Sequence, residues 1–167
     1  IFKQKRTGQN GKDFNVYKFR SMVHDAELKS GPVWSTKDDP RITKIGKFIR
    51  KVRIDEIPQM FNILKGEMSL VGPRPLLMQY LKRYSTEQAR RHDVKPGITG
   101  WAQINGRNSI SWPEKFNLDV WYADNQSFRL DVKILIWTIG KVYKREGVQQ
   151  EGHVTAEEFM GNTDDGR

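Results

Sequence analysis

The sequence predicts an α+β fold, in which a mainly helical single domain carries a small antiparallel β-sheet or hairpin. Three observations lead to this expectation. Residues 2–20 contain two short apolar-aromatic runs around a turn rich in Gly and Asn, and several later segments repeat apolar residues at helical spacing. A chain of 167 residues also buries roughly 70% of the surface of its unfolded form, which favours a single core.

Composition narrows the classes of partner and excludes several kinds of site. The chain has 29 basic and 20 acidic residues, a formal net charge of +9, and this balance predicts an anionic partner: nucleic acid, a phosphorylated ligand or an acidic membrane surface. The absence of cysteine excludes a disulfide scaffold, a thiolate metal site and a cysteine nucleophile. The longest apolar stretch, residues 130–142, is interrupted by charges and is shorter than the ~20 residues of a membrane-spanning helix.

The first predicted element is a β-hairpin. Residues 14–20 place apolar or aromatic side chains among polar ones, as in a strand with one apolar face. We expect Lys18 and Arg20 on the other face, where a solvated strand surface is their simplest interpretation. A short helix over residues 22–29 and a loop over residues 30–40 follow.

A basic amphipathic helix is predicted over residues 43–53. Apolar residues recur at helical spacing, at Ile42, Ile45, Ile49 and Val52, and basic residues that include Arg50 fill the remaining surface. Helices of this kind lie on acidic membranes. A helix that turns its apolar side to the core and its basic side to solvent has the same pattern, so both interpretations stay open.

The next helix is predicted to begin at about Asp55 and to end at Gly66. Pro58 is tolerated in a first helical turn, and Gly is common just after a helix. The simplest role for Asp55 is an N-cap, with Glu56 complementing the helix dipole. Taken alone, these residues favour capping over catalysis.

A loop stiffened by proline follows this helix. Pro73 and Pro75 bracket Arg74, and each proline restricts both its own backbone and that of the residue before it. A guanidinium on such a loop loses little entropy when it pairs with phosphate or carboxylate. An exposed Arg on a stiff connector is an equal alternative.

Residues 76–91 predict a helix that is interrupted by a new cap at Ser85. Turns at Pro96-Gly97 and at residues 105–106 then flank a short predicted strand, and the glycines of this segment would allow the backbone to approach a ligand closely. Arg107 follows the second turn directly. An ordinary pair of β-turns is the simpler interpretation of this segment.

Two further helices are predicted, over residues 112–122 and 131–145. The second is apolar around most of its first turns, so it is either buried or lies among lipid headgroups. Residues 149–167 are polar and predict a loose tail. We therefore expect one folded domain over residues 1–152 and a polar C-terminal tail over residues 153–167.

Familiar catalytic and nucleic-acid-binding motifs are absent from the sequence. It contains no P-loop, no His-Glu-x-x-His, no G-x-G-x-x-G and no G-x-S-x-G, and its three histidines are isolated. Of the adjacent carboxylate pairs, only Asp55-Glu56 lies in a structured, apolar-flanked setting among arginines. Basic residues are spread along the chain without a nucleic-acid motif, so no nucleic-acid partner is expected.

Taken together, the ordered segments resemble the bacterial sugar transferase family, the monotopic phosphoglycosyl transferases, in their compact single-domain form. The resembling segments are residues 18–22, 55–59, 66–75, 95–107 and 112–131, within about residues 2–152. Asp-Glu-x-Pro-Gln at residues 55–59 and Gly-Pro-Arg-Pro at residues 72–75 form a specific pair. Several such motifs in the same order make coincidence improbable.

The resemblance implies a transferase of sugar-1-phosphate. Such enzymes move this group from a nucleoside diphosphate sugar, usually a UDP-sugar, to polyprenyl phosphate, release UMP and initiate a glycan. It further implies that Asp55 is the nucleophile and that Glu56 helps to hold Mg²⁺. A carboxylate suits attack on phosphorus because the acyl phosphate it forms can still react, and cations must screen the two approaching anions. With the resemblance, catalysis outweighs capping for Asp55.

The same resemblance makes several other residues candidates for substrate binding. Arg74 and Arg107 are the stronger candidates for phosphate, and Arg50, Lys18 and Arg20 are weaker ones. Trp101 and Trp112 could stack on uracil or lie at the headgroup boundary, although a place in the core explains each equally well. Asp131 is a further polar candidate without a defined role.

Members of this family carry an N-terminal hydrophobic segment that enters the membrane, and this chain begins where that segment would already have ended. We expect the full-length protein at the cytoplasmic face of the bacterial membrane, in contact with its anionic surface, and this chain alone to be soluble or peripheral. Two alternatives remain. One is a non-catalytic basic module that binds a membrane surface or a polyanion, and the other is a glycosyltransferase that releases UDP.

Overall fold

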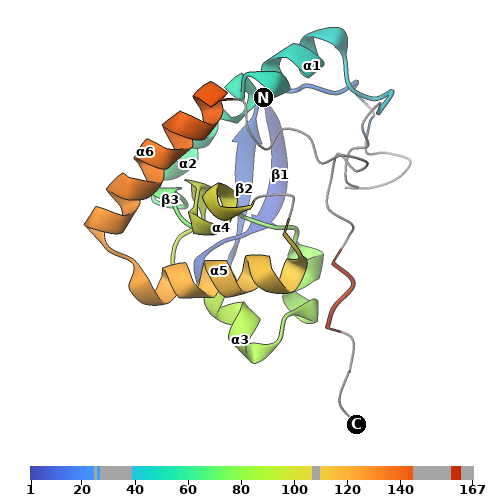
Figure 1. Ribbon diagram of the computed structural model, residues 1–167. Coiled ribbons are helices and arrows are strands. Elements are labelled where there is room, and N and C mark those ends of the chain that lie inside the picture. Colours follow the sequence, from blue (N-terminus) through green and yellow to red (C-terminus); the bar gives the residue numbers. More distant parts are fainter. Residues whose placement is uncertain (25, 27–38, 107–109, 145–158, 163–167) are drawn as a thin grey trace.

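The computed structural model describes residues 1–24, 26, 39–106, 110–144 and 159–162 (Figure 1). Helices predominate, and the strands form two small two-stranded sheets, so the α+β prediction is confirmed. Of the predicted helix over residues 22–29, the structure describes residues 22–24 and 26, and none of these is helical; Met22 instead forms an antiparallel bridge with Ile42. The rest of that helix, and the predicted loop over residues 30–40 except residues 39 and 40, lie outside the described residues. In chain order the elements are β1 (Phe2–Thr7), β2 (Asp13–Lys18), α1 (Lys44–Lys51), α2 (Gln59–Leu64), β3 (Ser69–Val71), α3 (Thr86–Ala89), β4 (Gly97–Thr99), α4 (Trp101–Asn105), α5 (Trp112–Asn125) and α6 (Phe128–Lys144). Short 3₁₀ segments cover Gln9–Gly11, Ile54–Glu56, Met78–Arg83 and Arg90–His92.

The predicted N-terminal hairpin is present. Strands β1 and β2 pair antiparallel from Phe2 opposite Lys18 to Thr7 opposite Asp13. Phe14 and Val16 are buried and pack with Met68. The expected face of Lys18 is wrong, because successive strand residues alternate sides and residue 18 therefore shares the buried side of residues 14 and 16.

Strands β3 and β4 form a parallel pair that the sequence did not indicate. The two strands meet at glycines: a Cβ at Gly72 would lie 2.2 Å from the Lys95 carbonyl oxygen, and one at Gly97 would lie 2.1 Å from the Gly72 nitrogen. The expected close approach is therefore made to another backbone segment. After β4 the chain turns directly into α4, so the second half of the short strand predicted between the two turns is helical instead.

The helix expected from Asp55 to Gly66 is divided in two. Residues Ile54–Glu56 form a 3₁₀ segment, and α2 begins only after Pro58. Asp55 makes no capping bond, so the N-cap prediction is wrong. Gly66 has a φ of 77° and follows the last residues of α2, as expected for a residue just after a helix.

The C-terminal half is helical around an aromatic cluster. The caps at Ser85 and Ser111 both form complete capping boxes, at the starts of α3 and α5. Phe116 of α5 packs with Leu76, Tyr80 and Phe159. The expectation of a loose tail is thus wrong at Phe159, whose side chain is only 4% exposed.

A second cluster joins β3 to the last helices. Val71, Tyr122 and Ile134 are buried together, and Trp101 packs against them. Apolar side chains on other faces of α1, α2 and α6 remain exposed, among them Phe48, Phe61, Leu64 and Ile136. Within the described residues, no helix combines the length and apolar character that a membrane span needs.

Candidate active site

Asp55 and Glu56 lie together between α1 and α2, in the 3₁₀ segment that interrupts the expected helix. Both residues are buried, with 9% and 8% of their surface exposed. The Phe19 backbone N–H donates to the Asp55 carbonyl oxygen at 2.9 Å, which ties this segment to the chain just after β2. The carboxylates are therefore held by backbone contacts between segments far apart in the sequence.

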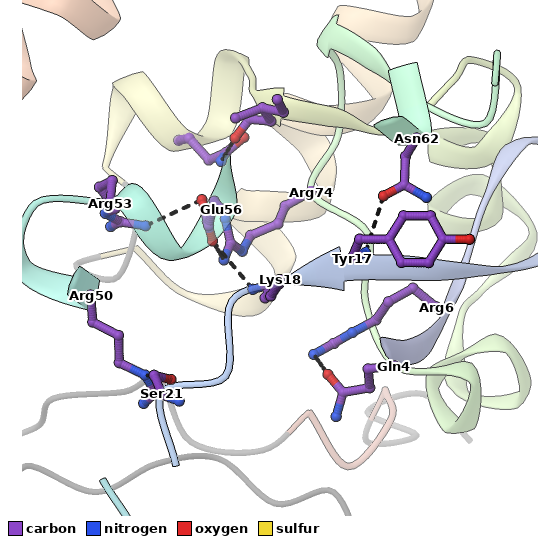
Figure 2. A network of polar contacts seen from close by, with 12 residues as sticks. Gln4, Arg6, Tyr17, Lys18, Ser21, Arg50, Arg53, Glu56, Asn62 and Arg74 are labelled. Carbon is purple, nitrogen blue, oxygen red and sulfur yellow. Dashed lines mark hydrogen bonds and ion pairs between the residues drawn. The ribbon is translucent and has the colours of Figure 1, made fainter. Parts of the chain in front are cut away.

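The Glu56 carboxylate is surrounded by cations from three parts of the chain (Figure 2). Its Oε1 accepts from Arg74 Nη2 at 2.8 Å and from Lys18 Nζ at 3.3 Å, and Arg53 Nη1 lies 3.7 Å from Oε2. Burial alone would raise the pKa of Glu56, but the charges of Arg74, Lys18 and Arg53 hold that pKa far below its usual range. Glu56 is therefore ionised and organises these cations.

The neighbouring Asp55 carboxylate is different. In the part of the chain that the structure describes, it has neither a hydrogen-bond donor nor an ion-pair partner. Burial and the negative charge of Glu56 raise its pKa, although Lys18, Arg50 and Arg53 oppose this shift. A carboxylate that is not engaged by the protein and lies beside a cation cluster is suited to attack an electrophilic centre of an anionic substrate.

The other predicted cations fall into three groups. Arg50 lies near the site: its Nε donates to Ser21 Oγ at 2.7 Å, and its charge acts on Asp55. Arg20 is exposed, and no ion pair of Arg20 is present within the described ranges. Arg107 lies outside the described residues. The structure thus brings Lys18, Arg50 and Arg74 to the carboxylate pair, but not Arg20.

Arg53 is the site residue that sequence reasoning missed. It counted only as part of the basic helix surface, yet it follows α1 in a left-handed conformation with a φ of 63°. This conformation is uncommon for a residue other than Gly, and such strain concentrates at functional sites. The left-handed conformation of Arg53 redirects the chain from α1 into the segment that carries Glu56. No feature of the sequence predicts this conformation.

The site offers limited but suitable oxygen ligands for a metal ion. The described residues contain no cluster of three or more His, Cys, Asp or Glu side chains that could enclose a metal. Both close contacts of Glu56 are to Oε1. Among the described residues, Arg53 is the one ion-pair partner of Oε2, and the Asp55 carboxylate is not engaged. Such a set fits Mg²⁺, which commonly binds one or two carboxylates together with substrate phosphates and water.

The aromatic and acidic candidates have structural contacts. Trp112 lies against Phe116, with ring centroids 5.4 Å apart, and belongs to the aromatic core. Trp101 stacks on Trp121 at 4.9 Å. Asp131 accepts from the Tyr122 hydroxyl at 2.7 Å, which joins α5 to α6. All of these contacts are made to residues outside the carboxylate pair.

The sequence of this chain is similar to those of known proteins. A model described as "Bacterial sugar transferase" matches residues 1–145. The chain is 60% identical to the uncharacterized sugar transferase EpsL of Bacillus subtilis (strain 168), over 98% of this chain and 80% of that relative.

Relatives with a named activity are longer. The chain is 41% identical to the undecaprenyl-phosphate galactose phosphotransferase of Salmonella typhimurium, over 88% of this chain and 34% of that protein. It is 42% identical to the UDP-glucose:undecaprenyl-phosphate glucose-1-phosphate transferase of Xanthomonas campestris pv. campestris, over 85% of this chain and 31% of that protein. Because the family model covers most of the sequence, the chain belongs to the bacterial sugar transferase family.

Proposed function

We propose that this chain transfers sugar-1-phosphate from a UDP-sugar to polyprenyl phosphate through a covalent intermediate on Asp55. The observation that carries the proposal is the contrast between two adjacent carboxylates. Cations that pair with Glu56 hold its pKa far below its usual range, whereas the Asp55 carboxylate has no such partner among the described residues and is acted on by the charges of Lys18, Arg50 and Arg53. The names of the relatives from Salmonella and Xanthomonas support the class of acceptor and the transferred group.

The proposed reaction has two displacements at phosphorus. An Asp55 oxygen first attacks the phosphorus that carries the sugar, and the bond from this phosphorus to the oxygen bridging to UMP breaks, so UMP leaves with that electron pair. A phosphate oxygen of polyprenyl phosphate then attacks the same phosphorus and releases the Asp55 carboxylate. The product is a polyprenyl diphosphate sugar. Lys18, Arg53 and Arg74 offset the negative charge that gathers in both steps.

Mg²⁺ is the cofactor that we propose for this site. Glu56 would hold it through Oε2, the oxygen without a close hydrogen bond, together with oxygens of the bound diphosphate. When bound, the ion neutralises diphosphate charge and stabilises the leaving phosphate. The cations around Oε1 remain available to orient the donor.

We further propose that helices α1 and α2 rest on the anionic cytoplasmic surface of the bacterial membrane. Exposed apolar side chains on these helices include Ile45, Phe48, Met60, Phe61 and Leu64, with exposed fractions of 44% to 81%. Lys44, Lys47 and Lys51 are exposed on the same helix α1. Apolar side chains beside lysines are the pattern of helices that bind the interface of anionic bilayers. The carboxylate pair lies between these two helices, close to where a lipid phosphate would be presented.

One assay separates this proposal from its alternatives. The chain is supplied with UDP-sugars, Mg²⁺ and polyprenyl phosphate in membrane vesicles, and the nucleotide product is identified. UMP supports the proposal, UDP indicates transfer of the sugar alone, and no nucleotide release indicates a non-catalytic binding module.

The role of Asp55 is tested by the variant Asp55→Asn. This variant should form no covalent phosphosugar adduct with UDP-sugar by intact-mass analysis, and it should release no UMP. Asp13→Asn is a matched control, because Asp13 is an exposed residue that pairs with Lys5 on the hairpin. An adduct on Asp55→Asn protein would exclude Asp55 as the nucleophile.

A further inference from the structure

We propose that the buried ion pair Arg91–Asp119 is a positioning device for Arg74. Arg91 lies in the 3₁₀ segment Arg90–His92, and Asp119 lies in the middle of α5. Both are almost fully buried, with 2% and 3% of their surface exposed. Among the contacts of the described residues, neither residue contacts Asp55 or Glu56. The pair therefore acts on the site indirectly, through Arg74.

The contacts of the Arg91 guanidinium connect α5 to the proline-bracketed loop. Its Nη2 donates to Asp119 Oδ2 at 2.7 Å and to the Arg74 carbonyl oxygen at 2.9 Å, and its Nε donates to Asp119 Oδ2 at 3.1 Å. The group also lies over the rings of Tyr84 and Phe116, with its central carbon 5.8 and 5.6 Å from their centroids. These contacts together fix the orientation of the guanidinium plane.

The hydrogen bond to the Arg74 carbonyl oxygen connects the fixed Arg91 guanidinium to the site. Pro73 and Pro75 restrict the backbone on both sides of residue 74. The Gly97 N–H holds the preceding carbonyl, that of Pro73, at 3.0 Å. With the Arg74 carbonyl held by Arg91, the two peptide planes around residue 74 are fixed. This sets the direction in which the Arg74 side chain leaves the backbone toward Glu56.

A contribution to stability alone is a weak explanation for an ion pair at this buried position. Burying two charges has a desolvation cost, and well-packed apolar replacements of a buried ion pair are often neutral or stabilising. Asp119 accepts two bonds from Arg91, whereas the backbone bond to Arg74 needs a donor that remains charged and planar. An apolar pair would fill the space equally well but would not hold the loop.

The test is a double-mutant cycle on the full chain, and it rests on the proposed role of Arg74 in binding the donor. In the variant Arg91→Met with Asp119→Leu both charges are removed together, so no unpaired charge is left in the core. We expect its melting temperature to stay within a few degrees of the parent's and its KM for UDP-sugar in UMP release to rise about ten- to a hundredfold, since small misplacements of binding groups have effects of this size. In an Arg74→Ala background the same replacement should change kcat/KM by less than twofold.

Two further variants keep the result interpretable. Arg91→Lys keeps the charge next to Asp119 but lacks the planar fork that makes both contacts, so it should raise KM in the same way even if the apolar pair does not fold. Phe159→Leu perturbs the same core without touching residue 74, and it should lower the melting temperature while KM is unchanged.

Some outcomes would overturn the positioning role. The positioning role is wrong if KM is unchanged in both Arg91 variants. It is also wrong if replacing the ion pair lowers kcat/KM by the same factor in the Arg74→Ala background as in the parent. A parent chain that releases no UMP would overturn the proposed function as well. A parent that releases UMP while the cycle fails would overturn the positioning role alone.

Discussion

Asp55 and Glu56 are neighbours in the chain, but the pKa values of their carboxylates are shifted in opposite directions. Cations depress the pKa of Glu56, whereas burial and the charge of Glu56 raise the pKa of Asp55. Two carboxylates whose environments separate their pKa values are typical of sites that assign them different roles. The same separation predicts how the protein responds to acid.

On acidification we expect activity to be lost before the fold. In the proposed mechanism Asp55 must be ionised to attack, so UMP release should fall as pH falls through its raised pKa. Glu56 has a depressed pKa, so the stability that its ion pairs contribute is complete above its unfolded pKa and is lost only as pH falls through the much lower folded value. The measurement compares kcat/KM with far-ultraviolet circular dichroism over the same pH series. Coincident loss of both signals would contradict this assignment.

Lys18 and Lys5 provide a matched pair on the hairpin. Lys18 bonds to Glu56 and has 23% of its side chain exposed, whereas Lys5 pairs with Asp13 and is 69% exposed. In the proposed function Lys18 also contacts the donor diphosphate, and one charge-assisted bond of this kind contributes about 1.5–3 kcal/mol. Lys18→Gln should therefore raise KM for UDP-sugar at least about tenfold. Lys5→Gln should leave it within twofold, and equal effects would show that overall charge, not placement, matters.

The residues of the site were predictable to different degrees. Asp55, Glu56 and Arg74 were found because they occur in specific motifs of a recognisable family. Lys18 was named, but its face was mistaken because Val16 and Tyr17 are adjacent and obscure the alternation. Arg53 could not be predicted, since a left-handed conformation at a non-Gly residue is imposed by the tertiary structure.

At the scale of elements, α1, the 3₁₀ segment and α2 form one unit whose inner side holds the carboxylates and whose outer side is apolar. Phe48 and Phe61 are each 62% exposed on this outer side. Full burial of a Phe side chain contributes about 1.5–3 kcal/mol. The proposed membrane contact therefore makes a quantitative prediction.

Replacement of both side chains, Phe48→Ser with Phe61→Ser, should weaken binding to vesicles that contain anionic lipid by more than about tenfold in a sedimentation assay. Met160→Ser is the control, because Met160 is 75% exposed and belongs to residues 159–162, the red segment that Figure 1 shows away from α1 and α2. Equal binding by the double variant and the parent would show that the membrane does not contact this unit.

Elements with strong local signals were predicted best. The cap at Ser85 and the hairpin depend on nearby residues, and the structure confirms both. The parallel pair β3–β4 was missed because each strand has only three residues and its partner lies far along the chain. Division of the expected helix at Pro58 shows how a tertiary contact, here from Phe19 to Asp55, overrides a continuous apolar pattern.

At the scale of the whole molecule, residues near the C-terminus complete the core. Phe159 contacts the rings of Tyr80, Tyr84, Trp112 and Phe116, and Gln88 bonds to Asn162. A domain that ended at residue 152 would lack these contacts. The sequence suggested such a boundary because this segment is mostly polar and a single aromatic residue gives no periodic signal.

Phe159→Ala should lower the free energy of unfolding by about 3–5 kcal/mol, the usual cost of removing a buried Phe. Phe128→Ala is the matched control, since Phe128 is 84% exposed, and its effect should stay within about 0.5 kcal/mol. Urea denaturation of both variants measures the difference. Equal stability of the two variants would show that Phe159 is not part of the core.

The parallel pairing of β3 with β4 also has a kinetic consequence. The hairpin and the capped helices can form from neighbouring residues, but Ser69–Val71 must find Gly97–Thr99 across a long connection, and pairings of this kind form slowly. Arg74 comes three residues after the end of β3, so the proposed phosphate-binding arrangement should be complete only after that late event. In refolding from urea, recovery of UMP release should lag behind recovery of the helical signal, and simultaneous recovery would show that the strands meet early.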